Sequence, residues 1–254
     1  MKKRLTAMAL LFALLPGAAE AGLSRAALDT VAARLPPGAH LDMGISARDT
    51  AGTSRSLRDI AGGRPVFLNF IDYTCNTLCG TDLMLLANGI QRAGLRPGDF
   101  RIIVLGIDPK DGPADALKME DKEIPPSLRS VSTFLLPGKA VIAKATGALG
   151  FHYVYDPQID QFAHPVVVYA LAPDGAVRSV LSPLSLTIGD LRQAMRGPAP
   201  PSLYQRIHAL CYSYDPVTGV YTPRISFLLK LAGFATALLL AAGVGFLSWA
   251  GSRQ

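Results

Sequence analysis

The sequence lacks several features that would assign it to a common class. It has no basic stripe interleaved with aromatic side chains, so we expect no nucleic acid among its partners. The net charge of +6 arises largely at the two ends, and the rest of the chain is nearly balanced. No internal repeat occurs, and the only low-complexity tract is the Gly-Pro-Ala-Pro-Pro segment at 197–201. The stretch before that tract has the length of one folded domain, which we place at 22–197.

Cysteine is also scarce, with three in 254 residues, and the usual C-x-x-C redox spacing is missing. Cys75 and Cys79 are instead separated by three residues. In a helical turn, residues four apart lie about 5–6 Å apart at Cβ. That distance can close to a disulfide after local adjustment, and it also suits a soft metal ion such as Cu(I) or zinc. A pair of buried core cysteines is the third interpretation, but the polar residues around the pair argue against it.

The cysteine pair lies between a predicted strand and a predicted helix. The apolar run Val66–Ile71 predicts a buried strand. Apolar residues at i, i+3, i+4 and i+7 predict an amphipathic helix over 81–93. The N-terminus of a helix carries partial positive charge and lowers the pKa of a nearby thiol. We therefore expect both cysteines at a strand-to-helix turn, with thiolates available at neutral pH.

The two ends of the chain indicate export and membrane attachment. Residues 1–21 combine a basic start, a short apolar run and an Ala-x-Ala site, which predicts a cleaved signal peptide; the alternative is an uncleaved anchor. The uncharged run 231–250 predicts a transmembrane helix within 226–250, after a Pro-rich linker at 198–225; the alternative is a buried core helix. We expect a single-pass protein of the inner (cytoplasmic) membrane, with its main domain in the periplasm or outside the cell.

The order of elements in the body predicts an α/β, thioredoxin-like fold with a central mixed sheet flanked by helices. After the cysteine helix, the pattern indicates further strands at 100–107, 131–136, 166–171 and 176–181. Helices are expected at 114–123, 139–149 and 188–195. The last two strands flank a Pro-Asp-Gly turn, which is typical of a hairpin.

A third candidate ligand is His164, just before the strand at 166–171. In a thioredoxin-like fold the residue entering that strand faces the cysteine turn, and we expect Pro165 there in the cis form. A neutral imidazole beside two thiolates completes a three-ligand site for Cu(I), or for Cu(II) in a more square arrangement. The other histidines, His40, His152 and His208, are expected to be surface or structural residues.

Several motifs together resemble the Sco/SenC family. They are Cys75-x-x-x-Cys79 after the first strand, the IDPKD segment at 107–111, and a His before the strand that leads into Pro-Asp-Gly. The segments at 151–165 and 211–221, the second including Cys211, resemble a bacterial branch with a C-terminal membrane helix. The resemblance covers most of the chain from about Leu41 to the membrane segment. One departure is Gly80, where family members commonly carry Pro; glycine is expected to loosen the first turn of the helix.

The resemblance implies a thioredoxin-like fold and a copper site made by Cys75, Cys79 and His164. It also implies a role in assembling the binuclear copper centre of cytochrome c oxidase, whose copper-binding subunit is then the expected partner. A periplasmic copper donor or thiol reductant is a further partner. Asp108 either tunes the site or forms a turn before Pro109, and Cys211 is interpreted as an interaction or packing residue.

Two functions remain open from the sequence. The first is a membrane-held protein that binds copper and delivers it to the oxidase. The second is an enzyme, a thiol–disulfide oxidoreductase that uses Cys75 and Cys79 as a redox pair. A peroxidase is a weaker third possibility. Copper carriage needs a third ligand and thiol exchange does not, so His164 discriminates between the two main functions.

Overall fold

A computed structural model of the chain describes residues 22–75, 79–182, 186–197, 230, 233–240 and 243. The predicted signal peptide at 1–21 and linker at 198–225 lie outside these residues, as do His208, Cys211 and most of the predicted membrane segment at 226–250. In the part of the chain that is described, no helix is long and apolar enough to cross a membrane.

The described elements are, in chain order, α2 (Arg25–Leu28), β1 (Ala32–Ala33), β2 (Ser46–Asp49), β3 (Ser54–Ser56), α3 (Leu57–Ala61), β4 (Val66–Ile71), α4 (Cys79–Arg92), β5 (Arg101–Gly106), α5 (Pro113–Glu123), α6 (Pro126–Arg129), β6 (Ser132–Leu136), α7 (Lys139–Ala148), β7 (Phe151–His152), β8 (Val154–Asp156), β9 (Gln161–Ala163), β10 (Val168–Leu171), β11 (Val177–Leu181) and α8 (Ile188–Arg196).

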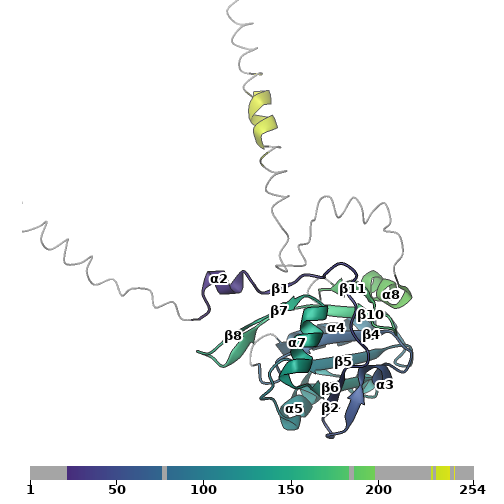
Figure 1. Ribbon diagram of the computed structural model, residues 1–254. Coiled ribbons are helices and arrows are strands. Elements are labelled where there is room, and N and C mark those ends of the chain that lie inside the picture. The colour runs from purple at the N-terminus through teal and green to yellow at the C-terminus, as the bar shows by residue number, and fades with distance from the viewer. Residues whose placement is uncertain are drawn as a thin grey trace, which may run out of the picture.

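A seven-stranded mixed sheet in the order β11-β10-β4-β5-β6-β2-β3 forms the centre of the fold (Figure 1). The three central strands, β4, β5 and β6, are parallel to one another. The outer strands all pair antiparallel with their neighbours. Parallel strands are buried on both faces, which explains the continuous apolar run of β4, where all six residues are buried.

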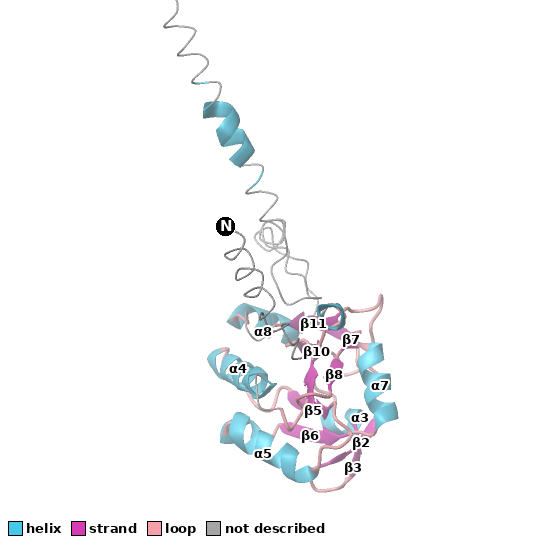
Figure 2. Ribbon diagram, turned by 90° about the vertical axis from the view of Figure 1, so that its left-hand side faces the viewer, coloured by secondary structure: helices cyan, strands magenta, loops and turns pink. Residues whose placement is uncertain are grey.

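Helices cover both faces of the sheet, as Figure 2 shows. On one face, α4, α5 and α8 pack a hydrophobic cluster that includes Leu86, Met119 and Leu191. On the other face, α3 and α7 pack a second cluster that includes Ile60 and Ala145. Because helices pack against both faces of the sheet, β4 is buried in the middle of the domain. The turn that follows β4 therefore begins at a well-packed strand.

The predicted order of strands and helices is confirmed, and so are the bounds of β4. Two boundaries differ by two residues, because α4 begins at Cys79 rather than at residue 81 and β10 begins at Val168 rather than at residue 166; the other predicted ends differ by at most one residue. The short pairs β2–β3, β1–β7 and β8–β9 were not expected from the sequence. Strands of two to four residues with mixed polarity give no measurable period, which explains why the pattern missed them.

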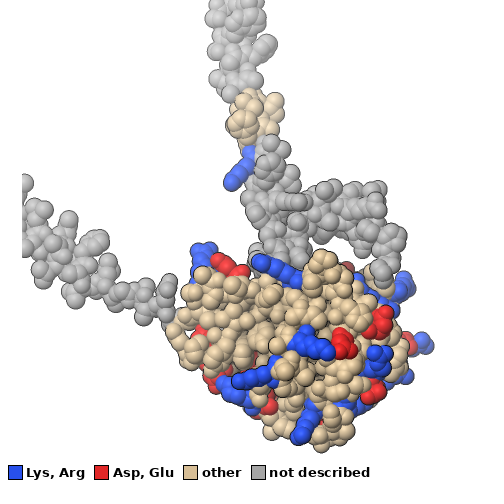
Figure 3. All heavy atoms as spheres, viewed as in Figure 1, with Lys and Arg blue, Asp and Glu red and all other residues tan. Residues whose placement is uncertain are grey.

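Charged side chains of both signs are interspersed on the face shown in Figure 3. Several form exposed ion pairs, such as Lys144 Nζ with Asp42 Oδ2 at 2.6 Å and Arg96 Nε with Asp99 Oδ2 at 3.0 Å. Pairs of this kind contribute little to stability because water screens them. The stability of the fold therefore rests on the two hydrophobic clusters rather than on surface charge.

Candidate metal and thiol site

Asp72 builds the turn that follows β4. Its side chain is fully buried, and its Oδ1 accepts hydrogen bonds from the backbone N of Thr74 at 3.0 Å and from Thr74 Oγ1 at 2.9 Å. The backbone N of Cys75 donates to the Asp72 carbonyl at 3.3 Å. An Asp side chain that binds the backbone two residues on stabilises a tight turn. Asp72 thus fixes the path of the chain into Cys75.

Tyr73 anchors the same turn to the sheet. Its buried hydroxyl lies 2.9 Å from the carbonyl oxygen of Val104 and 2.8 Å from that of Leu135, on β5 and β6. Its backbone N donates to Asp111 Oδ2 at 2.9 Å. Since β4 and β5 are parallel, their carboxyl ends lie at the same edge of the sheet, which is where ligands bind in open α/β sheets. The cysteine turn and the loop after β5 therefore form one surface.

The two cysteines occupy different structural positions. Cys75 lies in the turn, partly buried against the core cluster beneath α4, and it forms a disulfide. Cys79 is the first residue of α4, and its side chain is not among those described. The prediction that both cysteines lie in the turn is therefore corrected, because the helix begins two residues earlier. The position of Cys79 at a helix N-terminus is the one that favours a thiolate.

His164, the third predicted ligand, directly follows β9. Its Nδ1 lies 3.1 Å from the carbonyl oxygen of Pro165. A carbonyl oxygen only accepts, so Nδ1 carries the proton in this hydrogen bond, and Nε2 is the nitrogen that would bind a metal ion. Burial lowers the pKa of His164, while the Pro165 carbonyl and the charge of Asp72 oppose that shift. The ring is therefore neutral at pH 7, as a ligand must be.

The peptide bond before Pro165 is trans, because the described residues contain no cis peptide bond. The expected cis form is therefore wrong. The His164 side chain meets the Pro165 carbonyl within this trans segment, ahead of the first residue of β10. An X–Pro bond prefers trans by a small margin that local packing decides, so the sequence could not settle the isomer.

One hydrogen bond ties the segment that leads into His164 to the turn that leads into Cys75, and a second ties that turn to the loop after β5. Gln161 on β9 donates from Nε2 to the carbonyl oxygen of Thr74 at 3.2 Å. Asp111 accepts from the Tyr73 backbone on the other side of the turn. The His164 ring itself lies 6.0 Å from the ring of Phe151 on β7, between centroids. Among the described side chains, which exclude that of Cys79, no group of three His, Cys, Asp or Glu is arranged to hold a metal ion. The ligand set of Cys75, Cys79 and His164 therefore stays a prediction.

The sequence pattern of the SCO1/SenC family matches residues 38–196, which is more than half of the chain. The chain belongs to the SCO1/SenC family. The matched span contains both cysteines of the pair and His164. No curated protein matches the sequence.

Solved structures share the fold at low sequence identity. A SCO1/SenC family lipoprotein from Bacillus anthracis has a TM-score of 0.55 at 20% identity, over 65% of this chain and 98% of that one. ScoI from Bradyrhizobium japonicum with copper bound has a TM-score of 0.52 at 20% identity, over 62% and 99%. ScoI from Arabidopsis thaliana with copper bound has a TM-score of 0.51 at 18% identity, over 61% and 99%. These likenesses bear out the predicted α/β, thioredoxin-like fold.

Gly80, where the SCO1/SenC proteins commonly carry Pro, has a steric reason in this chain. A Cβ atom at Gly80 would overlap the carboxyl group of Glu123, lying 2.7 Å from its Cδ. The Glu123 side chain is only 7% exposed and pairs with Lys122 Nζ at 2.9 Å. Glycine therefore does more than loosen the first turn of α4, because it makes room for a buried carboxylate from the end of α5.

We expect Gly80→Pro to destabilise the protein by about 1–3 kcal/mol, the usual cost of overpacking a filled site. Proline itself is well tolerated in the first turn of a helix, so the cost should come from Glu123 alone. In a Glu123→Ala background the same substitution should therefore be neutral or stabilising. Urea unfolding of the four proteins of this double-mutant cycle measures the coupling.

Lys122→Ala is the control for that cycle, because it removes the ion pair without making room beside Gly80. It should leave the cost of Gly80→Pro unchanged. Equal costs in the wild-type and Glu123→Ala backgrounds would show that proline disturbs the cysteine helix for a reason other than contact with Glu123.

The other residues considered as possible site residues, Asp108, His152 and His40, lie in positions that a structural role explains. Asp108 accepts from the backbone N of Lys110 at 2.8 Å, which is the turn-forming role, and its carboxylate lies 3.8 Å from Lys110 Nζ. His152 is exposed on β7, and His40 pairs with Ala176 in an isolated bridge. Within the described residues, none of these three side chains bonds to the cysteine turn.

Two acids near the site were not predicted from the sequence. Burial raises the pKa of Asp111 to about 6, helped by the charges of Asp72 and Asp108 and opposed by the Tyr73 amide. Burial also raises the pKa of Asp82, in the first turn of α4, to about 7. Asp82 could have been found from its position four residues before Leu86, on the apolar face of the helix. Asp111 gives no such signal, since its role depends on contact with a distant segment.

Proposed function

We propose that this chain is a membrane-anchored copper carrier that delivers copper for assembly of the binuclear copper centre of cytochrome c oxidase. The observation that carries the proposal is the hydrogen bond from Gln161 Nε2 to the Thr74 carbonyl at 3.2 Å, which ties the strand that leads into His164 to the turn that leads into Cys75. Membership of the SCO1/SenC family supports it, and so does the copper bound in the Bradyrhizobium and Arabidopsis proteins of the same fold.

Cys79 is the natural partner of Cys75 in the disulfide, since it lies four residues further on at the start of α4. Two electrons and two protons from a dithiol reductant open that disulfide and leave two thiols, while the reductant becomes a disulfide. Deprotonated, the two sulfurs and the neutral His164 imidazole form a donor set that suits Cu(I). The disulfide form has no thiolate to offer, so reduction must come before copper binding.

The copper acceptor in this proposal is the copper-binding subunit of the oxidase, and the donor is a periplasmic copper protein. Residues 1–21 and 226–250 supply export and a single membrane helix in the inner membrane. Anchoring the domain beside a membrane-embedded target raises its effective concentration without any new contact. The segment at 198–225 is long enough to let the domain reach such a target.

A second function, thiol–disulfide oxidoreductase, is favoured by one specific observation. Cys75 is part of a disulfide at a strand-to-helix position, where a thiol of lowered pKa exchanges readily. In this function the pair reduces the cysteines of the copper acceptor and carries no metal. One cysteine pair can serve both functions at different times, so copper content decides whether the carrier function exists.

The test is the copper content of the full-length protein in detergent, loaded with Cu(I) in the reduced and in the oxidised form. We expect stoichiometric copper in the reduced protein and essentially none in the oxidised protein, because only thiolates bind Cu(I) strongly. Cys75→Ser should bind no copper under either reducing or oxidising conditions. A reduced wild-type protein that exchanges disulfides normally but retains no copper would rule out the carrier and leave the oxidoreductase.

A further inference from the structure

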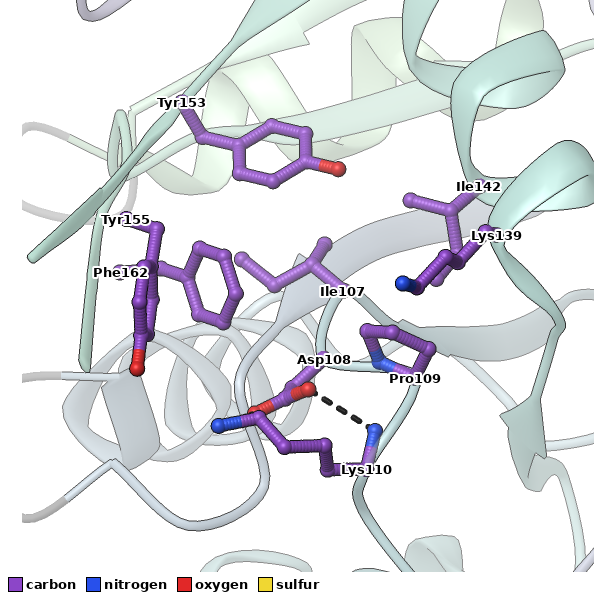
Figure 4. A pocket seen from close by; sticks show the side chains of 9 residues that line it. All are labelled: Ile107, Asp108, Pro109, Lys110, Lys139, Ile142, Tyr153, Tyr155 and Phe162. Carbon is purple, nitrogen blue, oxygen red and sulfur yellow. Dashed lines mark hydrogen bonds and ion pairs between the residues drawn. The ribbon is translucent and has the colours of Figure 1, made fainter. Parts of the chain in front are cut away.

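A pocket of about 460 Å³, lined by none of the predicted copper ligands, takes no part in the chemistry described above (Figure 4). Its walls come from three places: the β8–β9 hairpin, the loop after β5, and the first turn of α7. The volume falls in the range of pockets that bind small molecules or the side chains of a partner. The residues that line the pocket indicate the chemistry of its ligand.

One wall of the pocket is aromatic. The Phe162 ring lies 5.6 Å from that of Tyr153 and 5.1 Å from that of Tyr155, between ring centroids. Tyr155 is 39% exposed, and the other two rings are half-buried. The buried side chain of Ile142 on α7 also lines the pocket. Aromatic groups bury large areas and prefer tilted ring contacts, so this wall suits another aromatic ring.

The charges of the pocket leave one cation unmatched. Lys110 Nζ already lies 2.6 Å from Asp160 and 3.8 Å from Asp108. Lys139 takes part in none of the ion pairs found among the described residues. Figure 4 shows the ammonium group of Lys139 directed into the pocket. A ligand that complements this site therefore combines an aromatic body with a carboxylate.

The pocket is joined to the site of copper and thiol chemistry. The hairpin that carries Phe162 ends at Ala163, directly before His164. Its Gln161 binds the carbonyl of Thr74, next to Cys75. A chain that fills the pocket therefore lies against the hairpin that leads into His164 and is bonded to the residue before Cys75, which is where a polypeptide exchanging copper or thiols has to be.

The geometry points to a docking site for a partner polypeptide that presents an aromatic side chain next to an acidic one, with the ring against Phe162 and the carboxylate on Lys139. The inference rests on the proposed function in one respect, namely that the partner is the polypeptide that exchanges copper or thiols with Cys75. The chemistry that recognises it, one ring and one carboxylate, rests on the pocket alone.

The test uses the full-length reduced protein and two capped dipeptides, acetyl-Trp-Glu-amide and acetyl-Trp-Gln-amide, titrated by isothermal calorimetry. They match in shape and differ by one negative charge. We expect the acidic peptide to bind about five-fold more tightly, the effect of one partly exposed ion pair. Lys139→Gln should remove that preference and retain the binding of the neutral peptide. Phe162→Ala should weaken both peptides.

Lys118→Gln is the matched control, because Lys118 is exposed on α5 and does not line the pocket. It should leave both affinities unchanged. The inference is overturned if neither peptide saturates the protein at millimolar concentration, or if the preference for the acidic peptide survives Lys139→Gln. Tighter binding of free indole-3-acetate than of either peptide would overturn the polypeptide as occupant.

Copper content of the Lys139→Gln protein separates this inference from the proposed function. Lys139 is no predicted ligand, so the variant should load copper like the wild type. Absence of copper from the reduced wild-type protein counts against the proposed function, whereas the peptide titrations alone decide the pocket.

Discussion

His164→Ala is expected to abolish stoichiometric copper binding and to leave thiol–disulfide exchange at Cys75 intact. The imidazole is the only proposed ligand that does not come from the cysteine pair, and a two-thiolate site without it is incomplete. Changing a group that merely orients a ligand costs about 10–100-fold in metal affinity, so losing the ligand itself should cost more. Exchange with a dithiol needs only the two sulfurs. Copper retained after desalting and the rate of reduction by a dithiol measure the two effects separately.

His152→Ala is the matched control for that experiment. His152 is exposed on β7, twelve residues before His164 along the chain, and in the described part of the chain its ring does not bond to the cysteine turn. It should keep both copper and exchange. Full copper loading of His164→Ala would contradict the three-ligand site, and loss of exchange in that variant would show that the imidazole also serves the thiols.

The central elements could be predicted from the sequence because each carries its own pattern. The apolar run of β4 is buried on both faces, and the spacing of Leu83, Leu86 and Ile90 defines the buried face of α4. The β8–β9 hairpin could not be predicted in this way. Its strands of three residues alternate weakly, and its position depends on contacts such as Gln161 with Thr74. Those contacts join segments 87 residues apart, and no local pattern encodes them.

The candidate site likewise contains some residues that a sequence pattern identifies and others that only the folded structure reveals. The donor set of Cys75, Cys79 and His164 follows from residue type and from position in the family pattern, and it stays a prediction. The supporting acids could not be assigned. The role of Asp111 depends on the backbone of Tyr73, and that of Gly80 on Glu123, so each is visible only once the chain has folded. The pocket beside Phe162 depends on the same hairpin and was equally hidden.

Asp82 and Asn69 form an unusual polar pair between β4 and α4. Asn69 is the only polar residue of β4, and Asp82 lies in the first turn of α4; both are essentially inaccessible to water. Within the described part of the chain, Oδ1 of Asp82 and both polar atoms of the Asn69 side chain lack a hydrogen bond of good geometry. Asn69 lies near enough to lower the pKa of Asp82 slightly, but burial dominates and raises it to about 7. A carboxylate with so few partners is costly to ionise in place.

Asp82→Asn is expected to stabilise the protein at pH 8 by up to about 4 kcal/mol and to flatten the dependence of stability on pH. The folded-state pKa of Asp82 is about 7 against an ordinary 3.8, so the folded protein holds a proton that the unfolded chain has lost over this range. The contribution of Asp82 to the free energy of unfolding should therefore be most favourable below about pH 4. It should fall as pH rises towards 7 and level off above that pH. Urea unfolding of the wild type and the variant from pH 4 to pH 9 measures the difference.

Asp29→Asn is the control for Asp82, because Asp29 is exposed at the end of α2 and its removal should leave the wild-type pH profile in place. Asp111 is the competing acid, since its pKa is raised to about 6 and its carboxyl supports the turn through Tyr73. If Asp82→Asn retains the full decline in stability between pH 4 and pH 7, the titrating group is Asp111 or another acid. If the decline disappears in Asp82→Asn and persists in Asp29→Asn, the buried carboxyl of Asp82 at the start of α4 is the group whose ionisation lowers the stability of the domain above pH 4.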